Sequence, residues 1–301
     1  MKRSYTPHTL SLYLLVLPSV ILLFIFNYMP MYGLVISFQN YNVFGGIRRS
    51  PFVGLANYVK FLTDETFWKV MRNTLVLNFY DIAFGFTAPI LFALLVNEIH
   101  HVRFKKSVQV ISYLPHFISW VVVFGMMRSV FSPDPDGFLN FFVVRLFRQE
   151  PIYFLAEERY FRGILVAVNI WKAMGYQAIL YFAALAAIDS TLYEAASIDG
   201  ANRMRQTMHI TLPSLVPIIV LMFLLTISSI FTIGFERVFL FYNPLVYEVG
   251  DVISTYIYRI GLFGGQYSLT TAIGFVQGIL GFSLLYFSNR AAKRLTGLGL
   301  Y

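Results

Sequence analysis

Six long stretches of the chain carry almost no charged side chains. They cover residues 10–38, 73–97, 107–131, 163–188, 212–235 and 268–289. A hydrocarbon core about 30 Å thick is crossed by roughly 20 helical residues. Because lipid offers no hydrogen bonds to the backbone, each crossing segment must be helical. The pattern therefore predicts an all-α integral membrane protein with six transmembrane helices.

The composition agrees with a membrane protein and narrows its chemistry. Of the 301 residues, 57% are apolar and 13% are charged, whereas soluble domains average about 25% charged residues. Cysteine is absent, which excludes disulfides, thiolate nucleophiles and cysteine metal sites. The first apolar run follows Lys2 and Arg3, lacks a small-x-small cleavage pattern and meets no charge before Arg48. We therefore expect a retained span rather than a signal peptide.

The basic residues are concentrated in alternate loops. With the N-terminus inside, the cytoplasmic segments hold ten Lys and Arg against four Asp and Glu, a net charge of +6 out of the total of +8. The basic residues are Lys2, Arg3, Arg103, Lys105, Lys106, Arg203, Arg205, Arg290, Lys293 and Arg294. Because short cytoplasmic loops are enriched in Lys and Arg, both termini should be cytoplasmic. Topology thus explains the charge, and no nucleic-acid partner is expected.

A polar insert, at about residues 189–212, separates the fourth and fifth runs. Thr191 and Glu194 make a T-x-x-E pattern, which predicts a capping box at the start of a short helix. Gly200 supplies the left-handed turn that would end this helix.

The rest of the insert suggests a compact surface. Ala195 and Ala196 give the short helix a nearly bare face. A second short helix is expected through NRMRQTMH, after which Leu212 and Pro213 would open the fifth span. On these grounds alone, a loop that merely connects two spans explains the insert equally well.

The spacing within the insert matches a longer pattern. EAA at 194–196 is followed by three residues, Gly200, nine residues and ITLP, which ends at Pro213. This is the E-A-A-x3-G-x9-I-x-L-P signature, through which the chain resembles the permease subunits of binding-protein-dependent ABC importers. YLPHFISWVVV at 113–123 and WKAMGYQAILYFAAL at 171–185 resemble the complex-polysaccharide (LplB-type) sugar permeases. The resemblance covers essentially the whole chain.

The resemblance implies a type I ABC importer permease fold, with residues 1–301 as a single transmembrane permease domain. In this family the insert is a coupling helix that docks into a cleft on a cytoplasmic ATPase subunit. Transferred position by position, the coupling residues are Glu194, Ala195, Ala196, Asp199, Gly200, Leu212 and Pro213.

The same resemblance implies partners and cargo. We expect a second, related permease subunit, two cytoplasmic ATPase subunits and an extracytoplasmic solute-binding protein, assembled in a bacterial plasma (inner) membrane. The expected cargo is an oligosaccharide or polysaccharide fragment. The sequence has no G-x-x-x-x-G-K-[ST] phosphate loop. ATP and Mg²⁺ would therefore be used by the partner ATPase, and no cofactor is expected on this chain.

Signatures of catalysis are missing. The sequence has no H-E-x-x-H or G-x-S-x-G motif, and its five histidines are not arranged as a metal site. We therefore expect neither a catalytic nor a metal site. An ion-coupled secondary transporter of a polar solute is the alternative, with Asp81 or Lys172 as its coupling group. A membrane-embedded enzyme lacks an acid-base constellation to support it.

Three ionisable residues lie inside the expected spans: Asp81, Arg128 and Lys172. Such groups are costly in lipid and usually face a cavity or a partner. Asp81 lies nine residues beyond Arg72 and Lys172 ten beyond Arg162, which predicts similar depths at about 1.5 Å per residue. Either Asp81 and Lys172 pair inside the bundle, or each contacts a different backbone or subunit interface.

Polar and aromatic residues within the spans are the candidates for a sugar path. Aromatic faces and amide or hydroxyl groups hold sugars. Asn169, Gln177 and Gln277 are favoured because an amide that faced lipid would be unsatisfied. Trp171 and Tyr176 are the aromatic candidates, although packing is the commoner role of such residues. Gln277 lies in GFVQG, a small-xxx-small pattern that permits close packing against neighbouring spans or a second permease.

Overall fold

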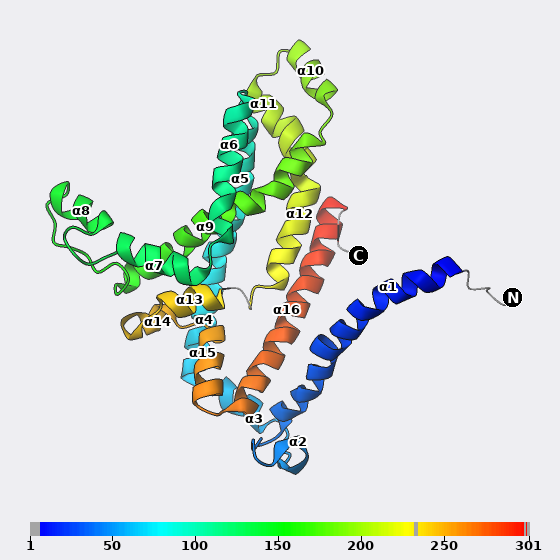
Figure 1. Ribbon diagram of the computed structural model, residues 1–301, viewed down its shortest axis with the longest axis vertical. Helices are drawn as coiled ribbons and strands as arrows, with labels where there is room; N and C mark the ends of the chain where they lie inside the picture. The colour runs from blue at the N-terminus through cyan, green and yellow to red at the C-terminus, as the bar shows by residue number, and fades with distance from the viewer. Residues whose placement is uncertain (1–6, 232–233, 298, 300–301) are drawn as a thin grey trace. The chain divides into compact units, whose positions relative to one another are not determined.

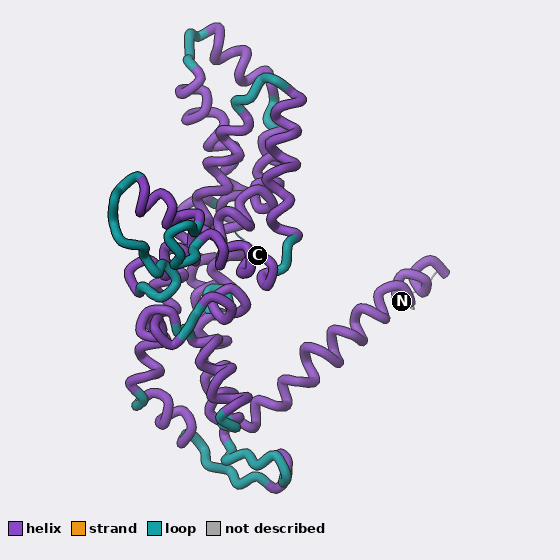
Figure 2. Tube along the Cα trace, turned by 60° about the vertical axis from the view of Figure 1, so that its left-hand side comes forward, coloured by secondary structure: helices purple, strands orange, loops and turns teal. Residues whose placement is uncertain are grey.

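The computed structural model describes residues 7–231, 234–297 and 299. In this part of the chain the regular structure is helical apart from one isolated bridge between Gln39 and Phe52, as Figures 1 and 2 show. The helices long and apolar enough to cross a membrane are Ser11–Phe38, Glu65–Asn97, Glu158–Ala186, Arg203–Ser228 and Tyr267–Arg294. A bent pair, Val102–Phe117 and Trp120–Val130, makes a sixth span if it counts as one. The expected all-α membrane fold is confirmed.

The chain forms two compact units. Unit 1 comprises Met1–Asp64 and Ile257–Gly278, and unit 2 comprises Glu65–Tyr256 and Ile279–Tyr301. The helices wholly within unit 1 are α1 (Pro7–Leu23), η1 (Phe24–Tyr28), η2 (Met29–Phe38), α2 (Gly46–Arg49), α3 (Ala56–Leu62) and η7 (Arg259–Phe263). Two helices, α15 (Ile253–Tyr258) and α16 (Tyr267–Thr296), contain residues of both units.

In unit 1 the first span runs without interruption from α1 through η1 into η2. None of its most apolar stretch is buried within the protein, as expected of a helix whose side chains meet lipid. The following loop is fastened to its end, because the Asn57 side-chain amide donates to the carbonyls of Ser37 (2.9 Å) and Gln39 (3.0 Å). The Phe38 ring also meets the Phe275 ring of α16 edge-on, with centroids 6.4 Å apart.

Unit 2 contains the remaining helices. In chain order they are α4 (Glu65–Tyr80), η3 (Asp81–Phe86), α5 (Thr87–Asn97), α6 (Val102–Tyr113), η4 (Leu114–Phe117), α7 (Trp120–Val130), α8 (Phe138–Arg145), α9 (Glu158–Ala186), α10 (Ser190–Ile198), α11 (Arg203–Gln206), η5 (Thr207–Thr211), α12 (Leu212–Ser228), α13 (Phe235–Phe241), η6 (Pro244–Val246) and α14 (Tyr247–Gly250).

The core of unit 2 forms around the 29-residue helix α9. One buried cluster joins Leu165 of α9 to Phe241 of α13, and a second joins Tyr181 of α9 to Ala93 of α5. Helix α6 approaches α9 so closely that a Cβ added to Gly175 would lie 2.1 Å from the backbone carbonyl oxygen of Ser112. Small residues permit such close contacts between helices in membranes, where packing replaces the hydrophobic effect as the driving force.

The third span is broken, and the single uninterrupted helix expected there is wrong. Its halves, Val102–Phe117 and Trp120–Val130, meet at an angle of 104°. Pro115 has no N–H to donate to a helix. Ser119 then starts α7 as an N-cap by accepting a hydrogen bond from the Val122 N–H (3.4 Å). Because the run stays apolar across the break, hydropathy gives no sign of it.

The fifth span begins earlier than expected. One helix covers Arg203–Ser228, so the separate short helix through NRMRQTMH and a span that opens at Leu212 are both wrong. The π turn η5, closed by a hydrogen bond from the Leu212 N–H to the Thr207 carbonyl, immediately precedes Pro213. Such widened turns let a helix continue past a residue that cannot donate.

The same span also ends before its expected boundary at residue 235. The helix stops at Ser228, and residues 232–233 of the expected span lie outside the described residues. Gly234 adopts a left-handed φ of 95° and starts α13. Helix α13, which carries Glu236 and Arg237, therefore begins where the expected span would have ended.

Candidate functional site

The insert forms a short exposed helix, α10, at the end of unit 2, beyond the ends of α6 and α11 (Figure 1). Its N-cap is Asp189, whose carboxylate accepts a hydrogen bond from the Thr191 N–H (2.9 Å). The expected capping box is therefore wrong, because Thr191 already lies inside the helix. Hydrogen bonds from the backbone and side chain of Thr191 hold the pKa of Asp189 below its usual value.

The end of α10 follows the sequence prediction. Gly200 has a left-handed φ of 76°. The Ala201 N–H donates to the Ala196 carbonyl (2.8 Å), and the Gly200 N–H donates to the Ser197 carbonyl (3.1 Å). These two bonds make a Schellman cap, which requires a residue that tolerates positive φ at this position. The predicted role of Gly200 in the turn is confirmed.

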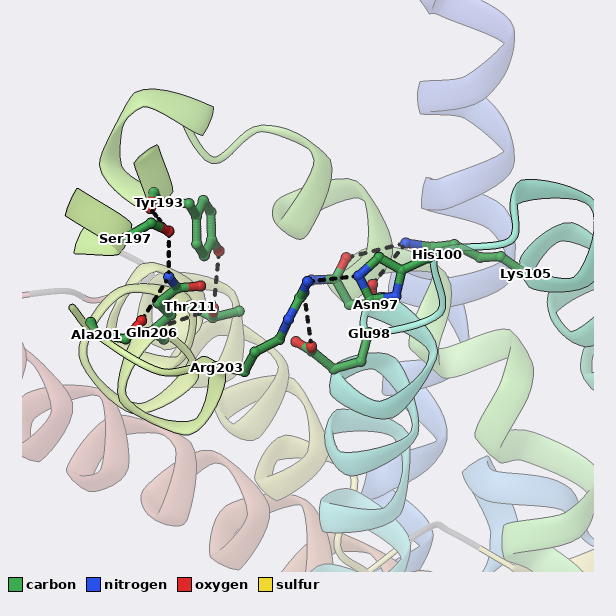
Figure 3. Close-up of polar contacts among 10 residues, drawn as sticks. All are labelled: Asn97, Glu98, His100, Lys105, Tyr193, Ser197, Ala201, Arg203, Gln206 and Thr211. Atoms are coloured by element: carbon green, nitrogen blue, oxygen red, sulfur yellow. Dashed lines mark hydrogen bonds and ion pairs between the residues drawn. The ribbon is translucent and has the colours of Figure 1, made fainter. Parts of the chain in front are cut away.

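Side chains fasten α10 to the beginning of the fifth span (Figure 3). The hydroxyl groups of Tyr193 and Thr211 are hydrogen-bonded at 2.9 Å. The Gln206 amide donates to the Ser197 hydroxyl (2.9 Å) and to the Ala201 carbonyl (3.2 Å). The short helix is thus held against a membrane span on one side.

A second set of contacts joins the insert to the turn between α5 and α6 (Figure 3). The Arg203 guanidinium contacts the His100 ring nitrogen at 2.7 Å and the Glu98 carboxylate at 3.5 Å. Within the turn itself, Lys105 of α6 donates to the backbone and side-chain oxygens of Asn97 of α5, both at 3.3 Å. Exposed ion pairs contribute little stability, so these contacts mainly set the orientation of the insert. No feature of the sequence pointed to the contacts of His100 and Arg203.

A cavity of about 850 Å³ opens between α10, the start of the fifth span and the end of α5. Its lining includes Tyr193, Glu194, Ser197, Ile198, Ala201, Asn202, Arg203, Gln206, Thr207, Thr211, Asn97 and Glu98. The side chain of Ile198 is 87% exposed at its rim. Ile198 thus offers an apolar side chain on the outer face of α10.

The structure brings most of the expected coupling residues to this surface. Glu194, Ala195 and Asp199 are exposed on α10, whereas Ala196 is half-buried. Leu212 and Pro213 lie farther along, in the first turn of α12, where Leu212 is half-buried and Pro213 exposed. Leu212 and Pro213 therefore belong to the fifth span and not to α10.

Of the two alternatives for Asp81 and Lys172, the pairing is wrong, and for Lys172 the contact with a separate backbone segment is confirmed. Asp81 binds Arg237 of α13, through Nη2 to Oδ2 at 2.5 Å and Nη1 to Oδ1 at 3.0 Å, and also accepts a hydrogen bond from Asn169 (3.3 Å). The side chains of Asp81 and Arg237 are 10% and 2% exposed, respectively. Arg237 was missed because it follows the expected end of the fifth span. Asp81, the carboxylate that an ion-coupled transporter would use, is thus already paired.

Lys172 instead supports the break in the third span. Its ammonium group donates to the carbonyls of His116 (2.7 Å) and Pro115 (3.4 Å) and lies 5.4 Å from the centre of the Trp120 ring. Helix ends leave carbonyls without intrahelical partners, and Lys172 supplies a donor to the His116 carbonyl. The Pro115 carbonyl, which already accepts from the Ile118 N–H (3.2 Å), gains Lys172 as a second donor. Arg128 is exposed on α7.

The expected sugar-path residues are only partly brought together. Asn169 and Gln177 line one cavity with Asp81. Trp171 is 38% exposed on α9, while Tyr176 stacks on the His116 ring with centroids 3.7 Å apart; neither lines that cavity. Gln277 is half-buried on α16, in unit 1.

Two relatives from Bacillus subtilis match nearly the whole chain. The polygalacturonan/rhamnogalacturonan transport system permease protein YteP is 42% identical over 96% of this chain and 90% of its own length. The protein LplB is 38% identical over 96% of this chain and 91% of its own length. No protein-family model matches the chain.

A solved structure agrees with these relatives. One chain in the crystal structure of a bacterial alginate ABC transporter, in complex with an alginate pentasaccharide-bound periplasmic protein, has a TM-score of 0.89 and 38% identity. The match covers 97% of each chain. Sequence and structure therefore agree over almost the full length, and the chain belongs to the family of ABC sugar-transporter permeases that includes YteP and LplB.

Proposed function

We propose that this permease subunit imports an oligosaccharide or polysaccharide fragment, and that α10 is the helix through which a cytoplasmic ATPase drives it. The names of YteP and of the alginate transporter support a saccharide cargo. The observation that carries the coupling role is the geometry of α10, which is capped at both ends, fastened to the fifth span and exposed at Glu194, Ala195 and Ile198.

The mechanism follows from this attachment. ATP and Mg²⁺ are bound by the partner ATPase, and its closure moves α10. Because Tyr193 and Gln206 join α10 to the fifth span, the motion passes into the membrane helices as a rigid-body movement. Coupling of this kind requires that the ATPase bind the two conformations of the permease with different affinity.

The complete importer contains further subunits. A second, related permease would complete the membrane path, two ATPase subunits would bind the coupling helices, and a solute-binding protein would deliver the saccharide, as the periplasmic protein in the alginate transporter complex suggests. The chain would cross the plasma (inner) membrane several times with both termini in the cytoplasm. Its residues 1–301 would act as one permease domain.

Co-purification tests the coupling role. In Glu194→Lys and Ile198→Glu, a new charge enters the exposed face of α10. The expected result is loss of the ATPase subunit from a complex that still contains both permeases. Glu150→Lys is the matched control, since Glu150 is exposed between α8 and α9, far along the chain from the insert. Retention of the ATPase and normal saccharide-stimulated ATP hydrolysis in both α10 variants would refute the assignment.

A further inference from the structure

Helix α7 runs across the end of α6 instead of continuing it (Figure 1). Arg103, Lys105 and Lys106 place the start of α6 at the cytoplasmic surface. From there the 12 residues of α6 and the 4 of η4 rise about 24 Å, which crosses most of a hydrocarbon core about 30 Å thick. The bend of 104° follows at this depth. Helix α7 therefore lies nearly parallel to the membrane plane, close to its outer surface.

The two faces of α7 suit this position. On one face, Val123 and Phe124 pack in the core of unit 2. On the opposite face, Val121, Val122 and Met126 are exposed. A helix that lies in the membrane interface buries such an apolar face among the acyl chains. The exposed face of α7 is thus expected to contact lipid along its length.

Arg128 stands at the end of α7 without a partner on this chain. Among the described residues, none forms an ion pair or a hydrogen bond with its exposed guanidinium. A charge at the centre of the hydrocarbon would be costly, whereas an arginine near the interface can extend its charged end to the headgroups. The position of α7 therefore explains how an unpaired charge occurs within an apolar run.

Arg128 also lines a cavity of about 560 Å³ between the end of α7, the loop that follows it and α13. Asp134 lines the same cavity, and its carboxylate accepts a hydrogen bond from the Ser132 hydroxyl (2.7 Å). The rest of the lining combines apolar side chains, such as Phe124, with polar ones, such as Tyr153. Among the described residues, Arg128 and Asp134 are the charged members of this lining. The cavity therefore offers one cation and one anion.

We propose that α7 lies flat in the outer leaflet and that this cavity binds the headgroup of a zwitterionic phospholipid such as phosphatidylethanolamine. The Arg128 guanidinium binds the phosphate, because its planar N–H groups match phosphate oxygens in pairs. The Asp134 carboxylate binds the ammonium group, since it accepts further hydrogen bonds beside the one from Ser132. The acyl chains lie beside the exposed face of α7.

The balance of charge in the cavity distinguishes this ligand from its neighbours in chemistry. Phosphatidylglycerol has a phosphate but no ammonium group, so Asp134 would meet a negative charge without compensation. Free phosphoethanolamine has both charged groups but no acyl chains, so it gains nothing from the apolar face of α7. The site should therefore prefer the complete zwitterionic lipid to either compound.

Spin labels test the position of α7. The chain contains no cysteine, so single cysteines can carry a label at chosen positions. Val122 and Ser129 of α7 are exposed and seven residues apart, and Phe104 and Ile111 of α6 are the matched control pair. Seven residues span about 10 Å of helix. In the complete importer in liposomes, relaxation by dissolved oxygen and by a polar nickel complex gives the depth of each label.

For an average helix tilt of about 20°, the control positions on α6 should differ in depth by about 10 Å. The two positions on α7 should differ by less than about 6 Å, because α7 is turned by 104°. A difference near 10 Å on α7 as well would mean that it crosses the membrane, which overturns the inference. Labels on α7 that oxygen cannot reach would place the second permease on this face and overturn it equally.

Native mass spectrometry of the purified importer, equilibrated with equal amounts of phosphatidylethanolamine and phosphatidylglycerol, tests the headgroup site. Arg128→Gln should lower the retained phosphatidylethanolamine roughly tenfold, as loss of a charged hydrogen bond does, and Asp134→Asn should abolish the preference between the lipids. Arg145→Gln and Asp136→Asn are matched controls, because these two residues pair with each other at 3.9 Å outside the cavity. Equal retention in the wild type and in Arg128→Gln overturns the site. Displacement of the lipid by an equal concentration of free phosphoethanolamine overturns it too, because the ligand would then be the soluble compound.

Discussion

Asp81 and Arg237 form a buried ion pair within unit 2. Both side chains are almost fully buried, and the guanidinium binds both carboxylate oxygens. Removing one partner of such a pair leaves a buried charge uncompensated, whereas replacing both can be nearly neutral. The pair therefore fixes where α13 lies against η3, at the edge of the polar cavity.

A double-mutant cycle tests this pairing. Arg237→Met should destabilise the purified complex by about 3 to 5 kcal/mol, and Arg237→Met combined with Asp81→Asn should recover much of the loss. Thermal unfolding of the assembled importer measures both. Asp81→Asn combined with Lys172→Met is the control cycle and should be additive, because these residues share no contact. A large coupling in the control, with none between Asp81 and Arg237, would contradict the structure.

At this scale the sequence located two of the buried charges, Asp81 and Lys172, but it missed Arg237 and did not fix the contacts of the other two. Asp81 and Lys172 are both interior as expected, and their depth along separate helices is readable from residue counting. Residue counting gives the depth of a side chain along its helix but not the direction in which it points around the helix axis. It also cannot anticipate the break in the third span, where Lys172 reaches the carbonyls of Pro115 and His116. The sequence therefore left open whether Lys172 pairs with Asp81 or contacts backbone, and the structure shows the backbone contact.

The helix α10 is defined by its two caps. Asp189 satisfies an amide at its start, and Gly200 allows the two hydrogen bonds that close its end. With nine residues, it is too short to be stable in isolation. Its order depends on these caps and on the contacts of Tyr193 and Gln206.

Acidification should weaken the start of α10. Because the folded pKa of Asp189 is lowered, its contribution is complete above the unfolded pKa of about 3.9. That contribution is lost as the pH falls through the lower folded pKa. Hydrogen exchange of residues 190–198 should thus accelerate in strongly acidic buffer relative to Asp189→Asn, which keeps an N-cap without a titrating group. Identical pH dependence in the two proteins would exclude this cap.

Gly200→Ala should loosen the end of α10. The left-handed φ of 76° costs a residue with a Cβ about 1 kcal/mol, although no atom lies within 4 Å of the added carbon. Exchange of the Ala201 amide reports the loss. Gly125→Ala, in the helical α7 and also without a neighbour within 4 Å, should show no such effect. Equal protection of Ala201 in both variants would argue against the strained turn.

At the scale of helices and turns, the sequence predicts the features that depend on hydropathy and on residue spacing. Four spans and the turn at Gly200 follow directly from apolar runs and from one glycine. The break before α7 could not be predicted in this way, because the chain stays apolar across it. The extension of the fifth span back to Arg203 could not be predicted either, because a π turn lets the helix continue past Pro213. The capping box expected at Thr191 was wrong because Asp189, two residues earlier, offers an equally suitable N-cap side chain.

At the scale of the whole molecule, unit 2 has two distinct polar regions. One end carries α10 and its open cavity, and the interior carries the paired charges and the cavity that Asn169 and Gln177 line with Asp81. The family signature identified the first from the sequence because its fixed positions lie within twenty residues. The interior cavity is assembled from three spans, so the sequence could name Asp81, Asn169 and Gln177 but not how they come together, and Arg237 required the structure.

The central claim is that α10 contacts the ATPase. A photoreactive amino acid at Ile198, on the face that is 87% exposed, can be compared with the same group at Val121, which is 65% exposed on α7. After illumination of membranes that contain the whole importer, the account predicts an adduct with the ATPase subunit from position 198 and none from position 121. An importer that is active before illumination yet gives no ATPase adduct from position 198 would contradict it.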